Sequence, residues 1–147
     1  MESYLWVRFS ANDMQAVDVL LVEDNTGDAV LIRQALSECP VPVTLHIALD
    51  GEQALLMLTN PPVQPDLIIL DLNIPKITGT ALLQRWRVGT TPVVVFSSSA
   101  NPTEKVRSLA LGAREFVSKP MDLDEFTHAV CRIVHDWALP EGTPSCN

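Results

Sequence analysis

The feature that most constrains the fold of this chain is a fivefold alternation of short aliphatic runs and longer amphipathic stretches. The runs lie at 18–22, 43–48, 66–70, 92–96 and 115–118. Runs of this length are typical of strands that are buried on both faces. Each is followed by apolar residues at helical spacing. Five such units in 147 residues predict one α/β domain, in which helices cover both faces of a parallel sheet.

Local signals mark where the helices begin and end. Asn25 or Thr26 can cap the first helix. Gly89 is the expected C-cap of the third helix. Asn101 followed by Pro102 predicts the start of the fourth helix, as N-cap and first helical residue. We expect the buried stripe of that fourth helix to consist of Val106, Leu109, Ala110 and Ala113.

Composition excludes several classes of function. The chain has 10 Lys and Arg against 18 Asp and Glu, which gives a net charge of −8 and an isoelectric point near 4.7. Because it carries no run of basic residues, a nucleic-acid-binding or anionic-membrane surface is not expected. Hydrophobic residues make up 47% of the chain, too many for a disordered segment. No apolar stretch approaches the roughly 20 residues that a membrane span needs.

The fivefold pattern covers residues 18–139, which we expect to form the folded domain. Residues 1–17 precede it as an N-terminal extension that lacks the features of a secretory signal, and Met14 is an alternative natural start. Residues 140–147 follow as a tail that is too short for a DNA-binding domain. We therefore expect the output to be contact with other proteins.

The three cysteines are Cys39, Cys131 and Cys146. An odd number without the spacing of a metal site predicts free thiols in a reducing compartment, so we expect a cytoplasmic protein. Cys131 falls within an apolar helical pattern and is predicted to be a small core residue.

Polar residues follow four of the five predicted strands, at the point where each strand ends. Glu23 and Asp24 follow the first, Asp71 the third, Ser97 the fourth and Lys119 the fifth. The carboxyl ends of parallel strands share one edge of the sheet, where open α/β sheets bind their ligands. We therefore expect three carboxylates, a hydroxyl and an ammonium to lie close together.

Crowded carboxylates repel one another, and a bound cation relieves the repulsion. Oxygen ligands suit Mg²⁺ or Mn²⁺, and Mg²⁺ is commonly held by one or two carboxylates, waters and a phosphate. We expect Asp24 and Asp71 to be direct ligands, Glu23 to act through water, and the backbone carbonyl of Asn73 to supply another oxygen.

Phosphoryl transfer is the chemistry that these groups favour. Asp71 is the expected nucleophile and phosphoacceptor. Lys119 and the hydroxyl of Ser97 are expected to hold two oxygens of the phosphoryl group, since positioning and charge neutralisation provide most of the catalysis in such reactions.

Each of these residues alone has a plainer interpretation. Asp71 alone would cap a loop, and Glu23 with Asp24 would be a solvated helix start that the helix dipole stabilises. Ser97 would be a loop hydroxyl, and Lys119 would form a surface ion pair of little energetic value. Their occurrence together at four strand ends favours the functional interpretation.

The set resembles the receiver domain of two-component response regulators, over about residues 18–137. The matching residues are Glu23, Asp24, Asp71, Pro75, Gly79, Ser97, Lys119 and Pro120. Within that family the chain is most similar to stand-alone regulators paired with cyanobacterial and bacterial phytochromes. The similarity is carried by Val22-Glu23-Asp24-Asn25 with Asp28, Asp71-Leu72-Asn73, Ser97-Ser98-Ser99 and Val117-Ser118-Lys119-Pro120-Met121-Asp122-Leu123.

The resemblance implies a fold and a mechanism. The fold is the flavodoxin-like doubly wound sheet with strand order 2-1-3-4-5. A sensor histidine kinase, in this subgroup a bacteriophytochrome, phosphorylates Asp71 in the presence of Mg²⁺. Ser97 and Phe116 then move as a switch, which changes how the surface of the fourth helix, fifth strand and fifth helix binds a downstream protein.

Two points stay open from the sequence. A homodimer through the fourth and fifth helices is plausible, and Phe126, Val130 and Trp137 fit either a core or an interface. The chain can also be a pseudo-receiver, an interaction scaffold that keeps the fold without phosphorylation. An aspartyl-phosphate phosphohydrolase is disfavoured because such enzymes place a second Asp two residues after the nucleophile, where Asn73 stands and cannot shuttle a proton. We therefore expect a signalling module and not an enzyme.

Overall fold

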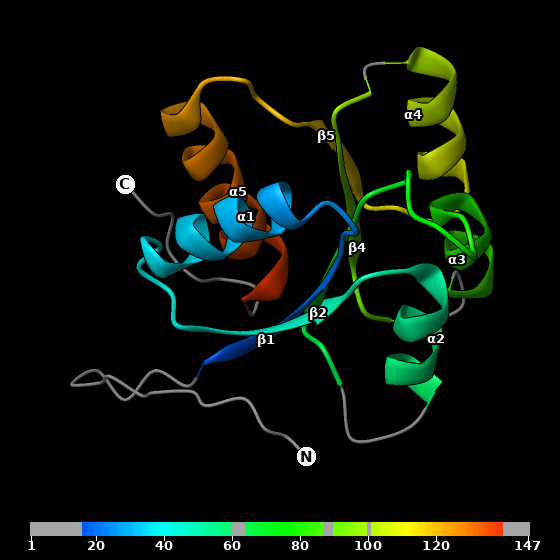
Figure 1. Cartoon of the computed structure of the whole chain (residues 1–147), viewed down its shortest axis with the longest axis horizontal. Helices are drawn as coiled ribbons and strands as arrows, with labels where there is room; N and C mark the ends of the chain where they lie inside the picture. Colours follow the sequence, from blue (N-terminus) through cyan, green and yellow to red (C-terminus); the bar gives the residue numbers. More distant parts are fainter. Residues whose placement is uncertain (1–15, 60–63, 87–89, 100, 140–147) are drawn as a thin grey trace.

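The computed structural model describes residues 16–59, 64–86, 90–99 and 101–139 (Figure 1). Strands and helices alternate along the chain, as the sequence predicts. The strands are β1 (Val17–Val22), β2 (Val43–Ala48), β3 (Leu67–Leu70), β4 (Val93–Ser97) and β5 (Glu115–Ser118). The helices are α1 (Thr26–Ser37), α2 (Gly51–Thr59), α3 (Gly79–Trp86), α4 (Pro102–Ala110) and α5 (Leu123–Ala138).

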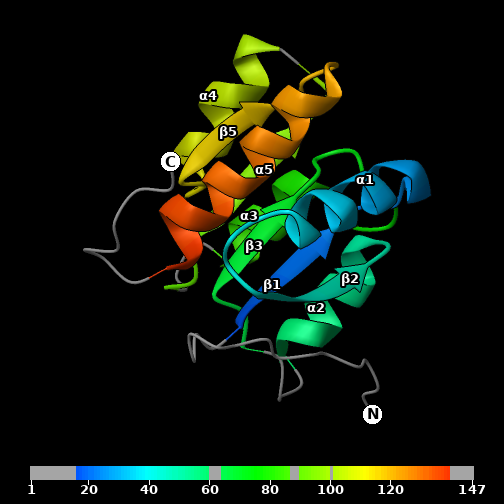
Figure 2. The same ribbon diagram turned by 90° about the vertical axis from the view of Figure 1, so that its left-hand side faces the viewer.

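The strands form one parallel sheet in the order β2-β1-β3-β4-β5. This confirms the predicted fold class and strand order. Helices α1 and α5 cover one face of the sheet, and α2, α3 and α4 cover the other (Figures 1 and 2). The central strands β1 and β3 are therefore buried on both sides, and the positions of their carboxyl ends are fixed by packing.

Each face of the sheet has its own hydrophobic core, because side chains alternate along a strand. In β1, Leu21 points toward α1 and α5, where it shares a cluster with Ile32 and Ile133. Leu20 points the other way and packs in the cluster that contains Leu82 of α3. Phe126 and Val130 belong to the first core, and this decides their role as core residues.

Side-chain oxygens cap the described helices, and the caps of α1 and α4 were expected from the sequence. Asn25 accepts a hydrogen bond of 2.9 Å from the Asp28 N–H, and Asn101 accepts one of 2.8 Å from the Thr103 N–H. Asp122 caps α5 in the same manner. The predicted C-cap Gly89 and nearly all of the expected extension over 1–17 lie outside the described residues.

The predicted stripe of α4 is buried only at Ala113, which lies beyond the end of the helix, and its other three residues are exposed. Val106 is 68% exposed and Leu109 is 41% exposed, and Ser108 is the buried residue of this helix. Helical spacing predicts that such residues share one face, but it does not say whether another element covers that face. Because α4 lies beside the edge strand β5, part of its apolar face has no neighbouring helix (Figure 1).

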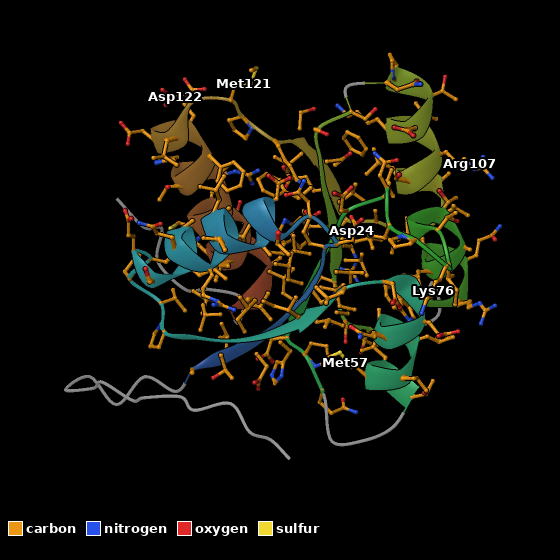
Figure 3. All side chains as sticks on the ribbon, in the orientation of Figure 1. Asp24, Met57, Lys76, Arg107, Met121 and Asp122 are labelled. Carbon is orange, nitrogen blue, oxygen red and sulfur yellow. A yellow bond between two sulfur atoms is a disulfide. The ribbon has the colours of Figure 1, made fainter. Side chains whose placement is uncertain are left out.

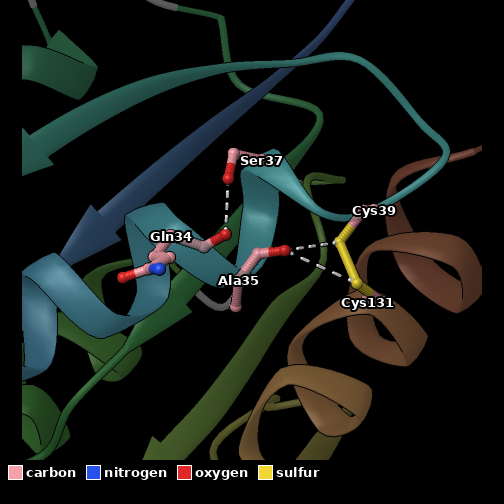
Figure 4. The surroundings of a disulfide bond; sticks show 5 residues. All are labelled: Gln34, Ala35, Ser37, Cys39 and Cys131. Carbon is pink, nitrogen blue, oxygen red and sulfur yellow. Dashed lines mark hydrogen bonds between the residues drawn. A yellow bond between two sulfur atoms is a disulfide. The ribbon is translucent and has the colours of Figure 1, made fainter. Parts of the chain in front are cut away.

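The prediction of free thiols is wrong for two of the three cysteines. Cys39, just after α1, and Cys131, within α5, form a disulfide with a Cα–Cα distance of 5.4 Å (Figure 4). The carbonyl oxygen of Ala35 lies 3.3 Å from one sulfur and 3.7 Å from the other. The two cysteines are 92 positions apart, and only the packing of α1 against α5 brings them together. Cys146 lies outside the described residues.

Within the described ranges, none of the helices combines the length and the apolar character that crossing a membrane would require.

Candidate functional site

Asp71 is the first residue after β3 and lies almost buried at the carboxyl edge of the sheet. Its backbone N–H donates to the carbonyl of Val22, at a distance of 3.0 Å, which ties it to the end of the neighbouring strand β1. Its Oδ1 accepts a hydrogen bond of 3.0 Å from the backbone N–H of Asn73. The packing of two central strands thus fixes where this carboxylate sits.

Close backbone packing shapes the loop after Asp71. The Gly79 N–H donates to the carbonyl of Leu72 at 3.3 Å, and a Cβ on Gly79 would lie 2.7 Å from the Leu72 Cα. On the other side, a Cβ on Gly51 would collide with the backbone carbonyl of Ile77. Lys76 adopts a left-handed conformation with φ 72°, and its ammonium lies 3.5 Å from a carboxylate oxygen of Asp50. These contacts brace the loop against the start of α2.

Lys119 is the centre of the charged cluster. Its backbone N–H donates to the carbonyl of Ser97 at 2.7 Å, which fixes the turn after β5. Its Nζ donates to Glu23 at 2.7 Å, to Asp28 at 2.8 Å and to Asp71 at 3.2 Å. The side chain is only 6% exposed. The expected convergence of Glu23, Asp71 and Lys119 is therefore present.

The electrostatics of the cluster favour additional positive charge. Burial raises the pKa of Glu23 to about 7, and the nearby Asp71 carboxylate contributes in the same direction, although Lys119 opposes both. Burial alone would lower the pKa of Lys119, but its hydrogen bonds to Asp28 and Glu23 and the charge of Asp71 raise it above its ordinary value. One ammonium thus serves three carboxylates.

Asp24 and Ser97 lie at the same sheet edge but make no hydrogen bond to Asp71 within the part of the chain that the structure describes. Asp24, labelled in Figure 3, is the second residue after β1, next to Glu23, and its side chain is exposed. The hydroxyl of Ser97 is fully buried and accepts a hydrogen bond of 3.2 Å from the backbone N–H of Ser99. Phe116, in the edge strand β5, is buried in the second hydrophobic core of the sheet.

A divalent cation fits the chemistry of these donors, although the described side chains do not form a ready set of three metal-ligating groups. Glu23 and Asp71 are close enough to share the Lys119 ammonium, and Asp24 lies next in sequence to Glu23. The buried, only partly neutralised carboxylate of Glu23 is the observation that supports this fit. Mg²⁺ commonly keeps several waters and takes one or two carboxylates.

Asp28 is among the residues that carry the family resemblance, but no role at the site was predicted for it. An acid in the first turn of a helix is ordinarily explained by the helix dipole. Its contact with Lys119 joins residues 91 positions apart. One signal was available: α1 begins at the same sheet edge as the other polar residues, so a first-turn side chain lies within reach of them.

Comparison with known proteins gives a consistent result. The sequence model of the response regulator receiver domain matches residues 19–131. The crystal structure of the phosphorylated cyanobacterial phytochrome response regulator RcpA is 32% identical, with a TM-score of 0.77, and the match covers 84% of this chain and 94% of that one. The Mn²⁺-bound response regulator Rcp1 is 28% identical, with a TM-score of 0.76, over 88% and 99% of the two chains.

Curated relatives are longer proteins. A probable transcriptional regulatory protein of Picosynechococcus sp. is 36% identical over 78% of this chain and 47% of its own length. A hybrid signal transduction histidine kinase of Dictyostelium discoideum is 31% identical over 80% of this chain but only 4% of its own length. The chain thus spans less than half the length of these relatives.

Proposed function

The chain belongs to the response regulator receiver domain family, and on this premise we propose that Asp71 accepts a phosphoryl group from a sensor histidine kinase. The observation that carries the proposal is the position of Asp71 at the end of β3, with Lys119 Nζ at 3.2 Å and buried Glu23 on the same ammonium. This arrangement joins a nucleophile, a fixed positive charge and surplus negative charge that a cation can neutralise.

The transfer is an in-line displacement at phosphorus. A carboxylate oxygen of Asp71 forms the new P–O bond while the P–N bond of the kinase phosphohistidine breaks. Lys119 neutralises charge on the phosphoryl oxygens, and the Asn73 N–H holds the Asp71 carboxylate in place. Bound Mg²⁺, held by Asp71 and Asp24, by Glu23 through water and by the Asn73 carbonyl, would supply further charge neutralisation.

Signal output depends on a change of surface. We assign the switch to Ser97, whose hydroxyl would exchange its present bond to the Ser99 N–H for a phosphoryl oxygen. Phe116 would respond from its buried position in β5. The exposed apolar residues Val106 and Leu109 of α4 suit a surface that binds a partner or a second copy of the chain.

Similarity to regulators whose names refer to phytochromes supports a bacteriophytochrome as the kinase. The cytoplasm stays the proposed compartment, although the free thiols that first suggested it are replaced by a disulfide at Cys39 and Cys131. In this proposal, residues 18–139 are the receiver domain, 1–17 an N-terminal extension and 140–147 a tail. The downstream partner is a protein.

Two alternatives make different predictions. A pseudo-receiver scaffold would bind its partner equally well without phosphorylation. A phosphohydrolase would release phosphate from a substrate, but the second acidic group that it needs is replaced by Asn73. The donor set around Asp71 favours the phosphoacceptor over both.

The test is phosphorylation of the purified chain with a small-molecule phosphodonor and Mg²⁺, read by intact mass. The wild type should gain one acid-stable, base-labile phosphoryl group, and Asp71→Asn should gain none. Asp66→Asn is the matched control because Asp66 is an exposed carboxylate at the opposite end of β3, and it should behave as the wild type. An unmodified wild type whose partner binding is unaffected by Asp71→Asn would establish the scaffold instead.

A further inference from the structure

Asp28 is a carboxylate at the site that the proposed transfer leaves without a role. Its Oδ2 accepts a 2.8 Å hydrogen bond from Lys119 Nζ, shorter than the 3.2 Å bond from that ammonium to Asp71. An acid at the third position of a helix often bonds back to the N-cap amide. Here Glu23 Oε2 accepts from the Asn25 N–H at 3.2 Å instead. The Asp28 carboxylate is thereby turned to Lys119.

The number of donors on Lys119 sets up a competition. An ammonium has three N–H donors, and those of Lys119 are directed at Glu23, Asp28 and Asp71. A phosphoryl group on Asp71 brings further oxygens that need a donor. The bond from Lys119 to Asp71 can pass to one of these oxygens, but any further bond from Lys119 to the phosphoryl group requires it to give up Glu23 or Asp28.

Burial decides which partner is released. The Glu23 side chain is only 1% exposed, and losing Lys119 would leave a buried charge unpaired, which is strongly destabilising. The Asp28 side chain is 33% exposed. It lines a cavity of about 230 Å³ together with Lys119, Pro120 and Met121, so water can replace the ammonium there. Asp28 is therefore the partner whose loss costs least.

We propose that Asp28 is a positioning residue for the phosphotransfer: it holds the Lys119 ammonium beside Asp71 before the reaction and releases it to the phosphoryl group afterwards. This inference rests on the proposed function of Asp71. Because a charged Asp28 competes for Lys119, it weakens the hold on any anion bound at Asp71. A role confined to stabilising the start of α1 would have no such effect.

The test uses beryllofluoride, a stable mimic of the phosphoryl group, on the full chain at saturating Mg²⁺, with affinity measured by calorimetry. Asp28→Asn and Asp28→Ser should each bind it about three- to fivefold more tightly than the wild type. Asp28→Glu, which keeps the charge, should restore an affinity close to that of the wild type. Melting temperatures report separately on the stability of α1.

Asp122→Asn is the matched control. Asp122 is an acid next to Met121 at the rim of the same cavity, and Asn keeps its capping bond to the Glu125 N–H. The control should leave the affinity unchanged. Equal tightening in Asp28→Asn and Asp122→Asn would overturn the proposal in favour of a general charge effect, and an unchanged affinity in Asp28→Asn and Asp28→Ser would also overturn it.

The nitrogen resonance of the Lys119 ammonium gives a second readout. It should shift on Asp28→Asn and stay in place on Asp122→Asn; no shift in either variant contradicts a role through Lys119. A wild type that binds beryllofluoride but is indifferent to Asp28 refutes this inference alone. A wild type that neither binds beryllofluoride nor takes up a phosphoryl group refutes the function of Asp71 as well.

Discussion

Single residues at the site depend on one another through charge. Removing Lys119 would leave Glu23 buried without a cation, and breaking such a pair typically costs about 3–5 kcal/mol of stability. A loss of activity in a Lys119 variant would then mix chemistry with unfolding. Asp71→Asn avoids this because the amide keeps the size of the side chain and removes a carboxylate from a cluster with surplus negative charge.

Gly79 is the residue where backbone packing beside the site can be tested. Gly79→Ala should lower the free energy of unfolding by about 2 kcal/mol, since the new methyl group would lie 2.7 Å from the Leu72 Cα, and backbone cannot yield as a flexible side chain can. Gly27→Ala, within α1, is the control; its methyl group would meet only the end of the Asn25 side chain. Urea unfolding of both variants measures the difference. Equal free energies of unfolding for Gly79→Ala and Gly27→Ala would contradict the close approach of Gly79 to the Leu72 backbone.

Glu115 allows a prediction about pH. Burial opposes its ionisation, but a two-bond contact with Arg132 and a bond from the Trp137 indole N–H hold the pKa of this carboxyl below its ordinary value of about 4.5. A lowered folded-state pKa stabilises the fold above pH 4.5, and this contribution disappears as the pH falls through the lowered value.

Glu115→Gln should therefore lower the free energy of unfolding by about 1 kcal/mol at pH 7. The difference from the wild type should shrink in urea titrations below pH 4.5 and vanish where the folded-state carboxyl is protonated. Glu125→Gln, an exposed acid of α5, should show a much smaller change at pH 7. If the wild type and Glu115→Gln differ in free energy of unfolding by the same amount at acidic pH, the stabilising effect of Glu115 comes from packing and not from its charge.

Among the elements, the loop between β5 and α5 borders the approach to Lys119. Met121 is fully exposed, Leu123 is 61% exposed, and both line the cavity beside Lys119 with Leu31 of α1. In the proposed transfer the kinase phosphohistidine approaches Asp71, and we expect the rim of this opening, which lies beside Lys119, to form part of the docking surface. Exposed apolar side chains at such a rim suit that contact.

The double variant Met121→Ala, Leu123→Ala should slow transfer from the phosphorylated kinase by about tenfold while uptake from a small phosphodonor stays at the wild-type rate. Val106→Ala, which shortens an exposed apolar residue on α4, should leave both rates unchanged. If the double variant slows phosphorylation equally with the kinase and with the small phosphodonor, the loop contributes to the reaction itself. If both rates are unchanged, the loop is not part of the kinase-docking surface.

Sequence patterns predicted strands and helices correctly where consecutive residues are fully buried. Strands such as β3, with four consecutive buried aliphatic residues, can be recognised because helices cover both faces of the sheet. The face of α4 was misjudged because its exposure depends on which helices lie beside it. The same reasoning applies to the site: strand ends predicted Asp71 and Lys119, whereas the contact of Asp28 with Lys119 and the Cys39–Cys131 pair became visible only once α1 was placed in space.

For the whole molecule, the disulfide is the largest single constraint on the unfolded chain. Cys39→Ser and Cys131→Ser should each lower the free energy of unfolding by about 4 kcal/mol, because a loop of 92 residues is no longer closed. A thiol reductant should bring the wild type to the same value and leave the variants unchanged. Cys146→Ser should retain the full response to reductant. If the reductant leaves the stability of the wild type unchanged, the disulfide does not form in solution.

The same bond divides the chain into a covalent ring and two open arms. The ring runs from Cys39 to Cys131 and contains Asp71, Ser97 and Lys119, whereas Glu23, Asp24 and Asp28 are on the N-terminal arm. The site residues of the ring and those of the N-terminal arm come together only because β1 pairs with β2 and β3 and α1 packs beside it. If the N-terminal arm lifts out of the sheet, the ring keeps the phosphoacceptor and its lysine but loses every other acid of the cluster. The competence of the site therefore depends on how firmly one central strand is held.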